Sequence, residues 1–522
     1  MSPPFNTTRS PNHMVASADA LATQAGLSIL AVGGNAVDAA IATNAAMAVV
    51  APHLCGMGGD LFALIHDGDD VHALNASGRA GSGSSAEALR ADGHTTMPFR
   101  HDIRTVTIPG CIDGWVALHD RFGTIALATL LAPAIALADG GFPASPLLVG
   151  SVSRLDSQGR ENLSELCTQA KRPGDRVRRP GVAAALRAIA ASGRVGFYGG
   201  EFGAGLRQLG QGLFTADDLE RLQAEWVTPL SASAWGVELW TVPPNSQGYL
   251  TLGAAALASG LELPMDPDDE HTAHLLIEAA KVAGFDRPAT LHAAADGPAL
   301  LSAIALRAHL LDTQRAADWP IAGRQGDTTY LCTTDSGGMG VSLIQSNASG
   351  FGSWLVEPTT QINLHNRGLG FNLEVGHPAE LRPATRPPHT LSPALATRQG
   401  QLAAVFGTMG GDAQPQILLQ LAARLFHYEQ SPATAMNAGR WALAGPTTGF
   451  DTWTSPSGPI VEIEGHAPPA WTEALTARGH KVSVRPEYDS DFGHAQLIIR
   501  DANGFWAGAS DPRARVGSVA GG

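Results

Sequence analysis

Residues 326–338 read Gly-Asp-Thr-Thr-Tyr-Leu-Cys-Thr-Thr-Asp-Ser-Gly-Gly. The β-branched and aromatic residues of Thr328–Thr334 predict a strand, and the residues after them predict a hairpin turn with a return strand at Met339–Ser346. A threonine hydroxyl becomes a useful nucleophile when a base lies beside it, and an N-terminal threonine can use its own α-amine as that base. An internal threonine gains this amine only if the preceding peptide bond is cut, here between Asp327 and Thr328. On residue chemistry alone, a Thr-rich strand remains the ordinary interpretation.

The composition predicts a globular protein and disfavours several partners. Hydrophobic residues make up 44% of the 522 residues and charged residues only 16%, enough apolar surface for a large core. The net charge of −14 argues against nucleic-acid binding, which needs a basic face. No uncharged apolar run reaches the roughly 18 residues of a membrane span, and no signal peptide is visible, so we expect a cytoplasmic protein without a membrane partner.

The remaining chain predicts helices around stacked strands. Helices are expected at Asp19–Ala31 and Asn35–Val50, followed by a Gly-rich loop at His53–Asp60 and a strand at Leu61–His66. From Gly110 to about Pro320 the pattern is mostly helical, and strands return after Gly323. The regular strand–helix alternation of a doubly wound sheet is missing, so an α+β fold is expected.

Several motifs point to chemistry that we reject. Gly56-Met-Gly-Gly59 follows a predicted helix and precedes a strand, the reverse of a dinucleotide-binding loop. His274 and Glu278 stand four residues apart on a predicted helix, but two ligands do not make a metal site, and we expect both on the helix surface. The four cysteines are widely separated, which excludes zinc-ligand spacing and predicts reduced thiols.

Motifs along almost the whole chain resemble the γ-glutamyltranspeptidase family of N-terminal nucleophile (Ntn) hydrolases. In chain order they are Gly33-Gly-Asn-Ala-Val-Asp-Ala-Ala40, Pro52-His-Leu-Cys-Gly-Met-Gly-Gly59, Pro109-Gly110, Phe197-Tyr-Gly-Gly200, Pro243-Pro-Asn-Ser-Gln-Gly248, His274-Leu-Leu-Ile-Glu-Ala-Ala-Lys281, Asp327-Thr-Thr-Tyr330, Arg386-Pro-Pro-His-Thr-Leu-Ser-Pro393, Met409-Gly-Gly-Asp412 and Ser510-Asp-Pro-Arg513.

The resemblance implies a four-layer αββα sandwich made as one precursor. Self-cleavage would give a large subunit of residues 1–327 and a small subunit of residues 328–522, intertwined in one core; the resemblance also allows a homodimer. Thr328 would attack an amide carbonyl through an acyl-enzyme, with Ser346 supporting it. Gly410 and Gly411 match the family's oxyanion-hole glycines, where the backbone must approach the substrate closely. No metal and no cofactor are implied.

The sequence departs from the family where a γ-glutamyl group would be held. Leu364–Phe371 lacks the acidic residue that grips the α-amino group, while His389 and Thr390 replace the serine pair that grips the α-carboxylate. The arginine of the family's Phe-Arg-Glu segment aligns near Ser77, and the arginine of this chain is displaced by two positions, to Arg79. We therefore expect a pocket lined by cations and free of carboxylates, which suits an anionic substrate without an ammonium group. The predicted substrate-binding residues are Arg79, Asn347, Asn366, Arg367, His389, Thr390 and Asp412.

These departures are similar to the oxamate amidohydrolase subgroup of the family. The favoured hypothesis is hydrolysis of a small amide that carries a carboxylate, such as oxamate. The alternative within the enzyme class is γ-glutamyl hydrolysis or transfer. A third hypothesis is a binding or scaffold protein that keeps the fold without processing or chemistry.

Overall fold

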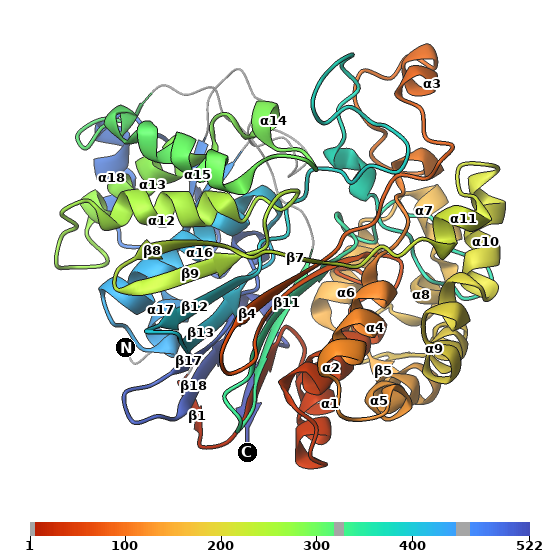
Figure 1. Cartoon of the computed structure of the whole chain (residues 1–522). Coiled ribbons are helices and arrows are strands. Elements are labelled where there is room, and N and C mark those ends of the chain that lie inside the picture. Colours follow the sequence, from red (N-terminus) through yellow and green to blue (C-terminus); the bar gives the residue numbers. More distant parts are fainter. Residues whose placement is uncertain (1–5, 318–327, 445–459) are drawn as a thin grey trace.

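The computed structural model describes residues 6–317, 328–444 and 460–522. Two antiparallel seven-stranded sheets lie face to face between helices (Figure 1). The first sheet has the order β1 (Thr8–Ser10), β18 (Trp506–Ser510), β17 (Gln496–Arg500), β13 (Gln401–Gly407), β12 (Ala394–Arg398), β9 (Val237–Thr241) and β8 (Leu230–Ala234). The second has the order β19 (Ser518–Gly521), β2 (Met14–Ser17), β10 (Thr329–Thr334), β11 (Gly340–Ser346), β3 (Asp60–His66), β4 (Val71–Ala76) and β7 (Glu225–Val227).

Helices cover the outer face of each sheet. The second sheet is covered by α1 (Ala20–Ala31), α2 (Ala36–Val50) and α4 (Cys111–Phe122), with α5 (Leu127–Gly140) and α9 (Pro180–Tyr198) behind them. The first sheet is covered by α12 (Tyr249–Ser259), α16 (Gln414–Ala422) and α17 (Pro432–Asn437), with α13 (Glu270–Gly284), α15 (Gly297–Leu306) and α18 (Ala470–Ala477) further out. The expected αββα sandwich is confirmed.

Three layers of apolar packing hold this sandwich together. One core lies between the second sheet and its helices, and another between the first sheet and its helices. The third fills the space between the sheets, where Phe62, Tyr330 and Val405 are fully buried. Each of the two sheets contains strands from before and from after Thr328, so a cut at that point would leave two chains that share both sheets.

The hairpin predicted around Thr328 is present and lies at the centre of the second sheet. β10 pairs with β11, with Thr329 opposite Gln345, and β11 pairs with β3, with Ser346 opposite Asp60. The start of α2 holds the turn of this hairpin, because the Ala36 N–H donates to the Asp335 carboxylate at 2.9 Å. The observed strands agree with the predicted ones to within one residue at each end.

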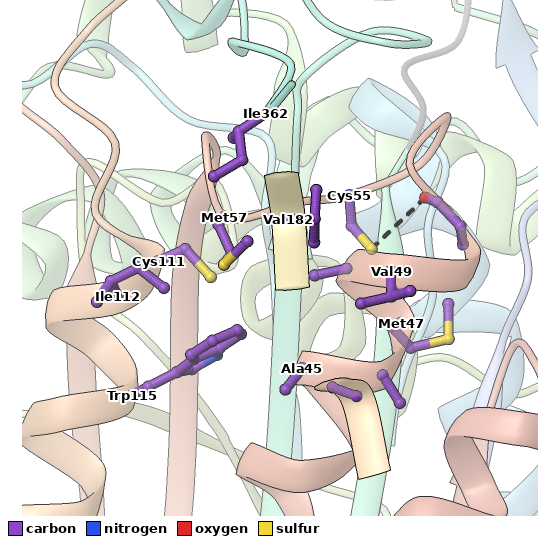
Figure 2. Packing of buried hydrophobic residues seen from close by; sticks show 14 of the residues in the cluster. Ala45, Met47, Val49, Cys55, Met57, Cys111, Ile112, Trp115, Val182 and Ile362 are labelled. Carbon is purple, nitrogen blue, oxygen red and sulfur yellow. Dashed lines mark hydrogen bonds between the residues drawn. The ribbon is translucent and has the colours of Figure 1, made fainter. Parts of the chain in front are cut away.

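The small residues of α2 explain how closely this helix packs. Every residue of α2 is buried, and a capping box between Asn35 and Asp38 closes its N-terminus. Figure 2 shows Ala45 and Met47 of this helix in the core that also contains Met57 and Trp115. After α2 the chain enters the Gly-rich loop, where the backbone of Gly59 lies against that of Ser346, too close for a side chain at Gly59. The closely packed α2 therefore places the Gly-rich loop beside Ser346 at the end of β11.

One sequence prediction is confirmed with an addition, and another is wrong. The region from Gly110 to Pro320 is mostly helical, as predicted, but it also contains the short strands β5 (Phe142–Pro143), β6 (Arg176–Val177), β7, β8 and β9, of which β8 and β9 extend the first sheet. His274 and Glu278 are not on the helix surface: both side chains are fully buried in α13. The cysteines Cys55, Cys111, Cys167 and Cys332 are free thiols, as predicted.

Candidate active site

Thr328 immediately precedes β10 and is almost completely buried, with 1% of its surface exposed. Its hydroxyl donates a hydrogen bond to the Ser346 Oγ at 3.1 Å. Thr329 and Gln345 form the last pair of the β10–β11 ladder, so the rigid end of the hairpin brings the two hydroxyls together. Asp327 lies outside the described residues.

The hydroxyl oxygen of Ser346 accepts hydrogen bonds from several donors. Besides Thr328, the Ala348 N–H donates to it at 2.8 Å and the Arg367 Nη2 at 3.2 Å. Hydrogen bonds from charged donors are about twice as strong as neutral ones, so Arg367 gives this serine an electropositive setting. Such a setting favours the build-up of negative charge on the neighbouring Thr328 oxygen.

Arg367 joins the serine to the loop that carries His389 and Thr390. It is 1% exposed, and its Nη1 donates to the Thr390 Oγ1 at 3.1 Å. Burial is the main cause that lowers the pKa of its guanidinium, to about 10, while Asp60 and Asp412 oppose this shift. Arg367 therefore keeps its positive charge at neutral pH.

The ring nitrogens of His389 bond to Asp60 and to the backbone of Leu391. Its Nδ1 accepts the Leu391 N–H at 3.2 Å, so its Nε2 carries the proton that faces the Asp60 carboxylate at 2.9 Å. Burial lowers the pKa of this imidazole to about 3, and the charge of Arg367 adds to the effect. The histidine is consequently neutral and occupied on both nitrogens.

Asp60 is the site residue that sequence reasoning missed. It is fully buried, and its Oδ1 accepts the Gly78 N–H at 2.9 Å. Its Oδ2 lies 3.5 Å from the His365 Nδ1 and 3.7 Å from the Arg367 Nε. Burial alone would raise the pKa of this carboxyl, but the neighbouring His365 and His389 hold it well below the usual range. The sequence signal was a single acid at the end of a Gly-rich loop.

Gly410 and Gly411 have backbone conformations that suit glycine. Their φ values are +139° and +54°, and the turn they form leads through Asp412 into α16. The Gln247 side-chain amide donates to the Gly411 and Thr390 carbonyls, both at 3.0 Å. Gln247 thereby ties the glycine turn to the threonine that Arg367 binds.

Asp412 shows that the pocket is not free of carboxylates, contrary to the sequence-based expectation. It is 1% exposed, and its Oδ1 lies 3.3 Å from the Arg287 Nη2. Together with Asp60 it balances the charges of Arg287 and Arg367. Asp412 is one of the predicted substrate-binding residues, whereas Asp60 lies far from the family's acidic segment and is not predicted by the sequence.

The comparisons with known proteins agree with this geometry. The family model described as gamma-glutamyltranspeptidase matches residues 22–521. The chain belongs to the γ-glutamyltranspeptidase family. It is 35% identical to the oxamate amidohydrolase proenzyme of Klebsiella pneumoniae, over 96% of this chain and 97% of the relative. It is 32% identical to the glutathione hydrolase-like YwrD proenzyme of Bacillus subtilis, again over 96% and 97%.

A solved structure shares the whole fold. The crystal structure of cephalosporin acylase from Bacillus halodurans superposes with a TM-score of 0.89 at 34% identity, covering 100% of this chain and 98% of the other. Among the curated relatives, several are named proenzymes, and both hydrolases and acylases occur. Family membership alone therefore does not define the substrate of this chain.

The other three predicted substrate-binding residues, Arg79, Asn347 and Asn366, also bind protein groups in this structure. Arg79 pairs with Glu225 at 3.3 Å and donates to the Leu222 carbonyl at 3.2 Å. The Asn347 side chain donates to the Pro52 carbonyl at 3.1 Å. The Asn366 Nδ2 donates to the Ser349 Oγ and to the Phe99 carbonyl, both at 2.8 Å. Their role in substrate binding stays a prediction.

One buried cluster among the described residues could hold a metal ion. His274, Glu278 and His480 offer ligand atoms within 4.8 Å of one another. However, the Lys281 ammonium donates to the Glu278 carboxylate at 2.7 Å, and His274 and His480 already bond to each other at 2.9 Å. The positive charge of Lys281 therefore balances the negative charge of the Glu278 carboxylate, as a metal ion in this cluster would. Within the three described ranges, no helix is both long and apolar enough to cross a bilayer.

Proposed function

We propose that this chain is a self-cleaving amidohydrolase with an N-terminal threonine, acting on the amide of a small carboxylate-bearing substrate such as oxamate. The observation that carries the proposal is the bond from Thr328 to Ser346, with Arg367 on the same oxygen. This places a nucleophile, its support and a buried cation in contact. The name of the oxamate amidohydrolase relative supports this choice of substrate.

The first step would convert the precursor into two chains. The Thr328 Oγ1 attacks the carbonyl carbon of Asp327, the peptide C–N bond breaks, and the hydroxyl proton ends on the released amine. Water then hydrolyses the resulting ester, which leaves the Asp327 carboxylate at the end of residues 1–327. Thr328 begins residues 328–522 with its hydroxyl free again.

In the hydrolytic cycle, the new α-amine would act as the base. It takes the Thr328 hydroxyl proton while the Oγ1 attacks the substrate amide, and the leaving ammonia receives that proton. The N–H groups of Gly410 and Gly411 are the candidate donors to the tetrahedral oxyanion. Water then cleaves the acyl-enzyme, so that oxamate would give oxalate and regenerate the threonine.

Arg367 is our candidate for binding the substrate carboxylate. It is a buried cation whose terminal nitrogens lie against Ser346 and Thr390, and guanidinium recognises carboxylates through paired hydrogen bonds. Arg79, by contrast, pairs with Glu225, whereas Arg367 is bonded to Ser346 beside the nucleophile.

The test is a direct assay of the purified, processed protein. We expect release of ammonia from oxamate and little release of p-nitroaniline from γ-glutamyl-p-nitroanilide. Activity on the γ-glutamyl compound alone would replace this proposal with γ-glutamyl hydrolysis or transfer. That alternative is supported by the name of the second relative and by the presence of Asp412 in the site.

A further inference from the structure

Asp60 has no assigned part in the reaction, although it lies at the centre of the site's buried charges. It is the first residue of β3 and stands directly opposite Ser346 in the sheet. A buried carboxylate is costly unless several donors or cations surround it. Asp60 has such surroundings, because a backbone N–H, two histidines and one arginine converge on it.

The Asp60 carboxylate lies beside the Nε edge of the Arg367 guanidinium. The Nε of Arg367 lies 3.7 Å from the Asp60 Oδ2, while its Nη1 and Nη2 donate to Thr390 and Ser346. A guanidinium is planar, so attraction at the Nε edge together with bonds at both terminal nitrogens fixes its rotation as well as its position. The carboxylate itself cannot rotate freely, because Gly78 holds its other oxygen.

His389 bonds to the same carboxylate oxygen of Asp60 that faces Arg367. It donates from Nε2 to Asp60 and accepts the Leu391 N–H at Nδ1, and its ring meets the edge of Phe62 at 4.7 Å between centroids. The histidine therefore contributes a fixed donor and no charge. Since Leu391 follows Thr390, the same loop supplies both the anchor for Asp60 and the hydroxyl on Arg367.

We propose that Asp60 is a positioning residue that orients the Arg367 guanidinium for a substrate carboxylate beside Thr328. The inference rests on the proposed function in that Arg367 is taken as the carboxylate-binding group. Asp60 itself does not touch the substrate. It acts through Arg367, and the neutral pairing of the two charges keeps the guanidinium in place until a carboxylate of the substrate arrives.

The experiment measures binding of oxalate, the expected product, by titration calorimetry on processed enzyme. Asp60→Asn keeps the shape and the acceptor for Gly78 but removes the charge, and we expect oxalate affinity to fall by about 10-fold or more. Arg367→Gln should lower it at least as much. Because Asp60 acts through Arg367, the double variant should bind within about threefold of Arg367→Gln. Additive losses, or an unchanged affinity in Asp60→Asn, would overturn the proposal.

Matched variants separate positioning from general destabilisation. Asp113 is also a buried carboxylate paired with an arginine, its Oδ1 lying 2.7 Å from the Arg194 Nε, and Asp113→Asn should leave oxalate affinity within about twofold of wild type. If Asp60→Asn does not fold, His389→Phe removes one donor to Asp60 and should still weaken oxalate binding, by a smaller factor. Unchanged binding in His389→Phe would then refute the proposal.

The same titration keeps this inference distinct from the proposed function. If wild type hydrolyses only the γ-glutamyl compound yet loses oxalate affinity in Asp60→Asn, the substrate proposal fails while the role of Asp60 stands. If oxamate is hydrolysed but the Asp60 variants bind oxalate normally, the positioning role fails alone. Wild-type protein that does not bind oxalate would contradict the positioning role directly.

Discussion

Replacing Ser346 by alanine should slow self-cleavage strongly while leaving the fold intact. The Ser346 Oγ accepts the Thr328 hydroxyl at 3.1 Å, the Ala348 N–H at 2.8 Å and the Arg367 Nη2 at 3.2 Å. A hydrogen bond in a charged setting is worth about 1.5–3 kcal/mol. If that support is lost as charge develops on the Thr328 oxygen, cleavage should slow by about 10- to 150-fold.

The variant also leaves buried donors without their acceptor. Each unsatisfied buried donor costs about 1–3 kcal/mol, so we expect Ser346→Ala to unfold at lower denaturant concentration than wild type. The rate of cleavage is measured by following fresh precursor on denaturing gels, at a temperature where circular dichroism shows that both proteins are folded.

A matched serine on the same strand supplies the control. Ser342 also lies buried on β11, where its Oγ accepts the Tyr330 hydroxyl at 2.8 Å. Ser342→Ala should cost about 1 kcal/mol of stability and leave the cleavage rate within about threefold. The reasoning would be refuted if Ser346→Ala cleaved within about twofold of wild type, or if both variants were slowed equally.

Further predictions concern charge and pH. Lys281→Met should destabilise the protein by about 3–5 kcal/mol in denaturant unfolding, because it leaves Glu278 buried without its cation, and a loss below about 1 kcal/mol would contradict this. Burial lowers the pKa of His274 to about 4 from 6.5. As pH drops, the unfolded chain therefore binds a proton at this histidine before the folded protein does, so the free energy of unfolding falls between pH 6.5 and 4. His274→Gln should make that decline less steep in thermal melts, and an equally steep decline would exclude His274 as its source. Arg367→Ala should lower kcat/KM for oxamate by about 100-fold, but Arg79→Ala by less than about threefold, because Arg367 is bonded to Ser346 beside Thr328 whereas Arg79 pairs with Glu225; the reverse order would make Arg79 the group that binds the substrate carboxylate.

The sequence predicted the central hairpin well because its signal is local. β-Branched residues on both sides of the turn at Asp335 define β10 and β11 without reference to the rest of the chain. Family motifs then identified Thr328 and Ser346, which the hairpin brings into contact. The short strand β8 is not predicted, because sheet pairing rather than its Ser- and Ala-rich composition stabilises it. The neighbouring β9 has Val, Trp and Thr, but its signal extends over only five residues.

Buried polar contacts between distant residues could not be predicted in the same way. Asp60 is bonded to His389, more than 300 positions later in the chain. A lone acid after a Gly-rich loop gives no sign of that partner. Polar residues on helices usually face solvent, so the sequence predicts His274 and Glu278 on the surface. In the structure His480 bonds to His274 and Lys281 donates to Glu278 inside the protein. Both cases depend on tertiary neighbours that only the fold reveals.

The identity of the new N-terminus tests the central claim most directly. Purified wild-type protein is incubated until processing stops, and each fragment is characterised by intact mass and N-terminal sequencing, with Thr328→Ala treated in parallel. We predict two fragments, residues 1–327 and 328–522, the second beginning with Thr328, and an intact Thr328→Ala chain. A single wild-type band at 54.1 kDa, a different N-terminus, or a cleaved Thr328→Ala protein would contradict the account.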